Sequence, residues 1–457
     1  MSGPPGAPTG PLAPPVPFGD ALRFWFRLGF INFGGPSGQI ALMHAELVER
    51  RRWIGEGRFL HALSFCMLLP GPEAQQLAIY IGWLLHRTRG GIAAGVLFVL
   101  PSFFLMLLLS WTYAAHGETT WIAGVFSGLS AGVLGMVVAA LLRIGGRSLR
   151  NAFAIAIAAA AFMAIFLVGV PFPAVVLAAA GLGYVIARLR PELVSVPAEL
   201  GDDPGAAIDD AAASAPHTMP SNRRAVKVLV VGLAVWWLPL LAVIAWRGTG
   251  DVLSQEAVFF STASMVTFGG AYAVLAYVNQ AAVYRFGWLG PGDVVAGLGL
   301  AESTPGPLIM VTQFVGFLAA YRFHGDLSPG VAGVLGSIVT VWATFAPCFL
   351  WIFLGAPFVE RIRGRRRLGA ALGAVTAAVV GVIASLALTF GVQVLFDTVS
   401  RREPFFVPVP VPHLGTLDPW ALAIAVGAFF ALRRSAVNPA LVAVGCGLVG
   451  LVHALVT

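Results

Sequence analysis

Residues 33–36 read FGGP and residues 70–72 read PGP, and both short motifs recur 235 positions later, as FGGA at 268–271 and as PGP at 305–307. Glycine and proline interrupt helices, so each copy is predicted to carry two breaks at corresponding positions. A constant offset between several matches indicates internal duplication. The chain is therefore predicted to consist of two homologous halves with Gly/Pro-broken helices.

The composition around these breaks is that of a membrane protein. Only 11% of the 457 residues are Asp, Glu, Lys or Arg, and 58% are apolar, whereas soluble domains carry about 25% charged residues. A membrane-spanning helix needs about 20 mostly apolar residues, which leaves room for roughly ten to twelve crossings. The predicted fold class is therefore an all-α polytopic membrane protein. The net charge of +7 lies in short arginine clusters between apolar segments, as in cytoplasmic loops, so no nucleic acid is expected as a partner.

Four segments follow from composition. Residues 1–17 form an uncharged Pro/Gly-rich tail that is expected to be disordered and lacks the features of a cleavable signal peptide. Residues 18–190 are the first membrane half, 191–224 a linker rich in Pro, Ala and Asp, and 225–457 the second half.

The number of predicted membrane crossings and the positions of the arginines predict that the second half is inverted relative to the first. An additional apolar segment, 225–246, precedes the second copy and contributes one odd crossing. The arginines at 50–52 and those that flank the linker then all lie in the cytoplasm, while the equivalent loops of the second copy are nearly neutral. This arrangement requires re-entrant motif segments. If each segment crossed the membrane fully, the cluster at 50–52 would lie outside.

Each break starts a new helix, and polar residues follow it. Helix N-termini carry partial positive charge and unpaired N–H donors, so converging N-termini would bind a small oxyanion near the middle of the membrane. The alternative is that the breaks are kinks that only improve helix packing; their recurrence with polar neighbours in both copies favours a site. The candidate substrate-binding residues are Gly34, Gly35, Ser37, Gly38, Gln39, Gly71, Gln75, Gln76, Gly269, Gly270, Thr304, Gly306 and Gln313.

Three ionisable residues lie near the breaks and are candidates for coupling or gating. Glu302 precedes the second PGP and is interpreted as a proton-titrating or gating group. Glu73 follows the first PGP, where a carboxylate also simply favours a helix N-terminus. Arg27 would attract an anion or extend to the membrane interface.

The sequence contains no nucleotide-binding loop, no metal-ligand spacing and no hydrolase motif. No catalytic residue, metal or cofactor is therefore predicted, and an intramembrane enzyme is a remote alternative. Energy for transport would come from ion gradients or the membrane potential, as in a secondary transporter.

Four runs of sequence resemble the chromate ion transporter family in its long-chain form, in which a linker joins two homologous halves. The resemblance implies chromate export across the bacterial cytoplasmic (inner) membrane by a multi-pass protein, and chromate resistance. Sulfate is a tetrahedral dianion of similar shape, so a permease for sulfate or another oxyanion is the alternative. Protons, the lipid bilayer and a second copy in a homodimer are the other partners considered. The runs are FGGPSGQIALMHAELVERRRWI (33–54), LLPGPEAQQLAIYIGW (68–83), FGGAYAVLAYV (268–278) and GLGLAESTPGPLIMVTQFVGFLAA (297–320).

Overall fold

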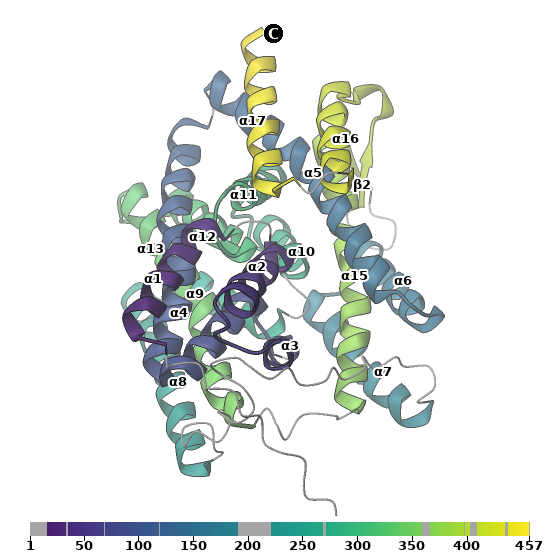
Figure 1. Ribbon diagram of the computed structural model, residues 1–457. Coiled ribbons are helices and arrows are strands. Elements are labelled where there is room, and N and C mark those ends of the chain that lie inside the picture. The colour runs from purple at the N-terminus through teal and green to yellow at the C-terminus, as the bar shows by residue number, and fades with distance from the viewer. Residues whose placement is uncertain are drawn as a thin grey trace, which may run out of the picture.

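The computed structural model is helical, as predicted, with one short β-hairpin (Figure 1). In the hairpin, β1 (Val399–Arg402) pairs antiparallel with β2 (Val409–Pro412), and Val399 lies opposite Pro412. Most of the predicted tail and linker, 1–15 and 191–220, lies outside the described residues. The structure describes residues 16–32, 35–67, 69–117, 119–190, 221–267, 271–358, 366–396, 398–402, 409–434 and 437–456.

The described elements fall into two series that are separated by one additional helix, α8 (Asn222–Arg247). The first series is α1 (Phe18–Ile31), α2 (Gly35–His44), the π-helix η1 (Ala45–Arg50), α3 (Glu56–Cys66), α4 (Glu73–His116), α5 (Thr120–Ser148), α6 (Ala152–Phe166) and α7 (Phe172–Leu189). The second is α9 (Val252–Val266), α10 (Ala271–Asn279), the π-helix η4 (Gln280–Arg285), α11 (Pro291–Ser303), the 3-10 turn η5 (Leu308–Met310), α12 (Val311–Arg322), α13 (Pro329–Gly355), η6 (Ala356–Phe358), α15 (Arg366–Leu395), η7 (Leu414–Thr416), α16 (Pro419–Arg434) and α17 (Pro439–Val456).

The two series are copies of one another, which confirms the predicted duplication. The π-helices η1 and η4 are 235 positions apart, the same offset as the sequence motifs. The starts of α5 and α15 are 246 positions apart, and α16 and α17 begin 267 positions after α6 and α7. The hairpin β1–β2 lies in the insertion between α15 and α16 that produces the last change of offset.

Helix starts are set by local chemistry. Asn151 and Asp251 precede α6 and α9, and their side-chain oxygens accept hydrogen bonds from the backbone N–H groups of Ala154 (2.8 Å) and Leu253 (2.9 Å). These are N-cap interactions, which satisfy donors that the helix itself leaves free. Helices α7, α11 and α13 instead begin with proline in the first turn, where its missing N–H costs nothing.

Helix α4 is a hairpin of two helical segments. The backbone is non-helical at His86 and Arg87, where Arg87 has φ +55°. A Cβ placed on Gly82 would lie 2.5 Å from the carbonyl oxygen of Gly90, so the two segments touch on either side of the reversal. In the second half, α12 and α13 form the equivalent hairpin, and the loop 323–328 takes the place of the reversal.

Helix α8 shows that the halves are inverted. Near its first residue, the guanidinium of Arg224 lies 5.6 Å from the ring centre of Trp83, just before the reversal in the first half. Near its last residue, Arg247 Nη2 lies 2.6 Å from Asp326 Oδ1, in the equivalent loop of the second half. A 26-residue helix is about 39 Å long. Equivalent loops of the two halves therefore lie at opposite ends of a helix long enough to cross a membrane.

The halves interlock through their long helices. Helix α5 of the first half packs against α16 and α17 of the second, and α15 packs against α6 and α7 of the first (Figure 1). Glycine allows the close approach: a Cβ on Gly128 would lie 2.2 Å from the carbonyl oxygen of Cys446. Each half thus completes its helix packing only with the other.

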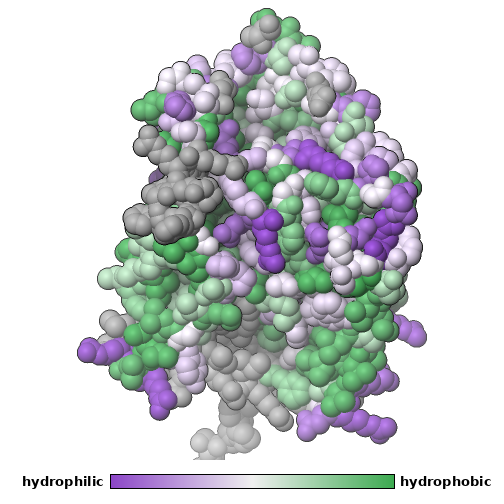
Figure 2. Space-filling view, turned by 180° about the vertical axis from the view of Figure 1, so that it is seen from behind, coloured by the Kyte–Doolittle hydropathy of each residue, from purple (hydrophilic) through white to green (hydrophobic). Residues whose placement is uncertain are grey.

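Seven helices within the described ranges are long and apolar enough to cross a membrane, fewer than the roughly ten to twelve expected from length: α4, α5, α7, α8, α13, α15 and α17. The difference arises because the motif regions fold as short helices, such as the 10-residue α2 and the 11-residue α3. Much of the outer surface is apolar (Figure 2), as lipid contact requires. By contrast, residues 311–320 of α12 are all buried, which places the second broken segment in the core.

Candidate functional site

Two reciprocal hydrogen bonds join the breaks of one half to those of the other. The N–H of Gly71 donates to the carbonyl oxygen of Thr267 (2.8 Å), and the N–H of Gly306 donates to that of Asn32 (2.8 Å). Both donors are the central glycines of PGP motifs, and both acceptors immediately precede an FGG motif. Asn32 and Thr267 are 235 positions apart and were not among the candidates. Their place in the repeat register is the signal that would have found them.

The central glycines cannot readily be replaced. Gly71 has φ +122° and Gly306 has φ +118°, a region that residues with a Cβ rarely adopt. A Cβ on Gly306 would lie 2.4 Å from Cβ of Ser102, and one on Gly71 would lie 3.0 Å from Sγ of Cys348. Ser102 and Cys348 are themselves 246 positions apart, at equivalent places in the two long helices. The PGP turn of each half therefore packs against the long helix of the other.

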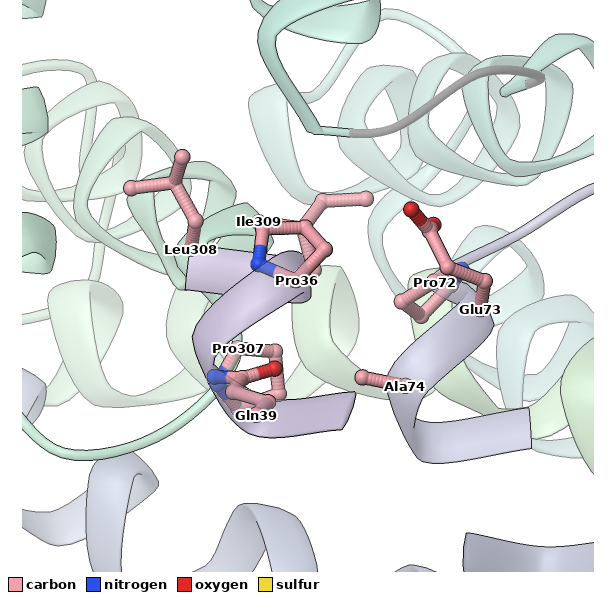
Figure 3. A pocket seen from close by; sticks show the side chains of 8 residues that line it. All are labelled: Pro36, Gln39, Pro72, Glu73, Ala74, Pro307, Leu308 and Ile309. Carbon is pink, nitrogen blue, oxygen red and sulfur yellow. The ribbon is translucent and has the colours of Figure 1, made fainter. Parts of the chain in front are cut away.

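A small pocket lies where three broken segments meet (Figure 3). Pro36 and Gln39 come from the first turns of α2, and residues 72–74 from the start of α4. Residues 307–309 come from the second PGP and the start of η5. Residues from the starts of three of the four predicted helices therefore line one pocket. The fourth predicted helix is α10, whose first residue follows the undescribed stretch 268–270.

The candidate glutamines mainly brace the backbone around this pocket. Gln39 lines the pocket, and its Nε2 donates to the carbonyl oxygen of Gly306 (2.5 Å). Gln76 Nε2 donates to Pro70 O (2.7 Å), which ties the first PGP to the helix that follows it. Gln75 and Gln313 similarly donate to carbonyl oxygens of Gly95 (3.4 Å) and Phe103 (2.9 Å). The structure thus places Gln39 at the pocket and gives the other three glutamines supporting contacts.

The remaining predicted binding residues are dispersed around the breaks. Gly35 starts α2 with φ +65°, and Ser37 and Gly38 follow in its first turn. The hydroxyl of Thr304 donates to the carbonyl oxygen of Ala301 (3.2 Å) at the end of α11. The other three candidates, Gly34, Gly269 and Gly270, lie outside the described residues.

The two candidate carboxylates occupy different environments. Glu73 lines the pocket at the first residue of α4, half-buried (Figure 3). Glu302 is 5% exposed near the end of α11, and its Oε1 accepts a hydrogen bond from the hydroxyl of Tyr272 on α10. Arg143 of α5 interacts electrostatically with both members of this pair. The sequence did not predict Tyr272, which is identified only by the folded contact between α10 and α11.

The predicted cation does not reach the pocket. Arg27 lies exposed on α1, between the exposed residues Phe26 and Phe30, and is not among the residues that line the pocket. Among the described residues no group of three His, Cys, Asp or Glu side chains is arranged to hold a metal ion.

Inverted repeats whose broken helices meet at a shared pocket are typical of membrane transport proteins. Within that class, the chain belongs to the chromate transporter family, which matches residues 19–184 and 255–451 and so covers both halves. It is 27% identical over 440 residues to the "Chromate transport protein" of Cupriavidus metallidurans, covering 96% of this chain and 94% of that protein. It is 30% identical over 382 residues to the "Chromate transport protein" of Pseudomonas aeruginosa, covering 82% of each. No solved structure matches the chain significantly.

Proposed function

We propose that the chain is a secondary transporter that exports chromate across the bacterial cytoplasmic membrane and thereby confers chromate resistance. Family membership and relatives named as chromate transport proteins support chromate as the substrate. The observation that carries the proposal is the convergence of three helix starts on one pocket, two of which directly follow the PGP glycines that make the reciprocal backbone bonds.

The chemistry of the pocket suits a small oxyanion. The first turns of α2, α4 and η5 present backbone N–H groups that their own helices leave without partners, and α-helix N-termini add partial positive charge. The amide of Gln39 adds a side-chain hydrogen-bonding group. In this conformation the pocket has room for about one water molecule, so a tetrahedral dianion would accept bonds from several such donors only after the pocket widens. Export is favoured electrically, because a dianion that leaves an inside-negative cell gains roughly 4.6 kcal/mol per 100 mV.

The reciprocal bonds provide the candidate gates. The two bonds, Gly71–Thr267 and Gly306–Asn32, are related by the internal repeat, and the halves are inverted. Alternate opening of one bond and then the other would expose the pocket first to one side of the membrane and then to the opposite side. In this proposal the Glu302–Tyr272 pair holds α11 against α10 in the closed state. Glu73 repels the anion from the start of α4 and so limits how long it stays bound, whereas Arg27 acts at the membrane interface.

The test is transport by the purified full chain in liposomes. With labelled chromate inside, an imposed positive potential outside is expected to drive chromate release, and the released ion is recovered as chromate. Unlabelled chromate, sulfate and molybdate are then compared as competitors. Stronger competition by sulfate than by chromate would assign the protein to sulfate or another oxyanion. Absence of any oxyanion flux, or recovery of a chemically altered ion, would contradict transport.

A further inference from the structure

A second buried carboxylate lies away from the pocket, on the short helix α9. Glu256 is 0% exposed, and neither of its carboxylate oxygens has a hydrogen-bond partner in the described part of the chain. Burial of an unpaired carboxylate in its charged form is strongly unfavourable. In this conformation Glu256 is therefore uncharged, with a proton bound.

The carboxylate lies at a close helix crossing of the second half, between α12 and α13. A Cβ placed on Gly336 would lie 2.5 Å from the carbonyl oxygen of Gly316 and 3.1 Å from Oε2 of Glu256. At the same crossing, a Cβ placed on Gly316 would lie 2.1 Å from the hydroxyl oxygen of Thr340. The hydroxyls of Ser337 and Thr340 are buried and unpaired in the described structure. Glu256 Oε2 thus lies at the crossing of α12 and α13, and the buried hydroxyls of Ser337 and Thr340 lie within about one helical turn of Gly336 at the same crossing.

The fold itself does not require an acid at this position. In the repeat register Glu256 corresponds to Ala21 of α1, which is also buried, at 2% exposed. The first half has the same kind of crossing between Gly82 and Gly90, with no carboxylate at the corresponding position. A buried acid that only one copy carries, at a site where the other copy packs with alanine, is typical of function within a membrane.

The charged groups around α9 leave Glu256 without a cation. Asp251, at the start of the same helix, repels a negative charge on Glu256. Arg247 of α8 is bonded to Asp251 (3.0 Å) and Asp326 (2.6 Å), and Arg322 at the end of α12 is bonded to Asp293 (2.6 Å). Helices α10 and α13, which also pack against α9, carry no Asp, Glu, Lys, Arg or His. Opening of the α12–α13 crossing to water is therefore what would allow the proton to leave.

We propose that Glu256 is a proton-binding site whose loading and release couple chromate movement to a proton gradient. This inference rests on the proposed transport function. The physical link is α9 itself, which runs from Glu256 to the break at Thr267, 11 positions or about 16 Å away. Thr267 accepts the backbone bond from Gly71 of the first PGP. A shift of α9 that follows loss of the proton is thereby transmitted to one of the two candidate gates.

The experiment separates exchange from coupling in liposomes that contain the purified full chain. Chromate/chromate exchange without a pH gradient reports transport alone. With the potential clamped at zero, an imposed gradient of one pH unit reports coupling, because exchange of one proton per chromate would give about a tenfold steady-state chromate ratio. Glu256→Gln, which resembles the protonated acid, is expected to keep exchange but to give a ratio near one. Glu49→Gln removes an exposed carboxylate (65% exposed side chain) and is the matched control.

Each result decides between the claims. Lack of exchange by the unmodified protein contradicts the proposed function, not this site. Exchange together with an unchanged tenfold ratio in Glu256→Gln overturns the proton site. Failure of Glu256→Gln to fold also overturns the proton site, because this variant replaces a neutral acid with a neutral isostere. Loss of chromate exchange in both Glu256→Gln and Glu256→Ala overturns it as well. Sodium-driven flux at constant pH that Glu256→Gln abolishes would reassign the site to a metal cation.

Discussion

The glycine at the centre of the second PGP offers a quantitative test of the crossed-break geometry. Gly306→Ala adds two separate costs. The first is backbone strain, because φ +118° is sparsely populated by residues with a Cβ and costs about 1–3 kcal/mol. The second is overpacking against Ser102, whose Cβ and Oγ would lie 2.4 Å and 2.5 Å from the new atom; overpacking costs about 1–3 kcal/mol. The expected loss of stability is therefore roughly 2–6 kcal/mol in total.

The two costs can be separated with one further substitution. Ser102→Gly removes both clashing atoms but leaves the backbone angle of residue 306 unchanged. The double variant Gly306→Ala/Ser102→Gly is therefore expected to recover about 1–3 kcal/mol of the loss. Gly35→Ala is the control for a substitution at positive φ without overpacking, since a Cβ added there would meet no atom within 4 Å; its φ of +65° lies in the left-handed helical region, so its strain is expected to be the smaller of the two.

The assay is unfolding of the purified protein in detergent, followed by chromate flux in liposomes for every variant that folds. Gly306→Ala is expected to abolish flux even where folded protein remains, because the strained turn no longer presents its N–H to Asn32. Equal stability of Gly306→Ala and Gly35→Ala, or no recovery by Ser102→Gly, would refute the close packing of this turn against the long helix of the first half.

Three further predictions address the gate, the topology and the effect of pH on stability. Glu302→Gln weakens the bond from Tyr272 by removing the carboxylate, so flux is expected to fall severalfold; wild-type flux at every pH would remove this pair from the gate. Cysteines at Arg51 and Arg285, which are exposed at equivalent ends of η1 and η4, should react with an impermeant reagent from opposite sides of the membrane, and reaction from one side would exclude inversion. Partial burial acts to raise the pKa of Glu46, but hydrogen bonds from its two arginine partners outweigh it and hold that pKa below the ordinary value. The resulting stability is present above the unfolded pKa of about 4.3 and is lost as pH falls through the folded value, so Glu46→Gln should destabilise the protein at pH 7 more than at pH 3 in thermal unfolding.

The features of the fold that were predicted well are those that depend on hydropathy or on the repeated motifs. The long apolar stretches and the offset of 235 positions identified the long helices and the two copies, because hydropathy and register are local properties of sequence. The parity argument predicted inversion, and the contacts at the two ends of α8 confirm it. Composition alone does not distinguish a long apolar helix from short buried helices such as α11 and α12.

The candidate site was predicted in part. Breaks at Gly71 and Gly306 were evident, but their partners Thr267 and Asn32 belong to the opposite half, and no local pattern predicts pairing between halves. The hydrogen bond to Glu302 from Tyr272 was missed for the same reason. Glu256 was not singled out because it lies away from both motifs; only its burial without a partner distinguishes it from a surface acid.

The backbone bonds at the breaks are the same in the two copies, whereas the buried acids Glu302 and Glu256 occur in the second copy only, which supports different roles for the two copies. Equivalent glycines make the crossed bonds in both halves, so the framework of the breaks is duplicated. The buried acids are not duplicated: Glu302 and Glu256 correspond in the first half to Met67 and Ala21. Coupling to a proton gradient, as proposed above, requires that buried Glu256 take up its proton from one side of the membrane and release it to the other, so this single acid must be reached from both sides in turn. The direction of net movement would then follow from the ion gradients and the membrane potential, while the duplicated breaks would supply an opening toward each side.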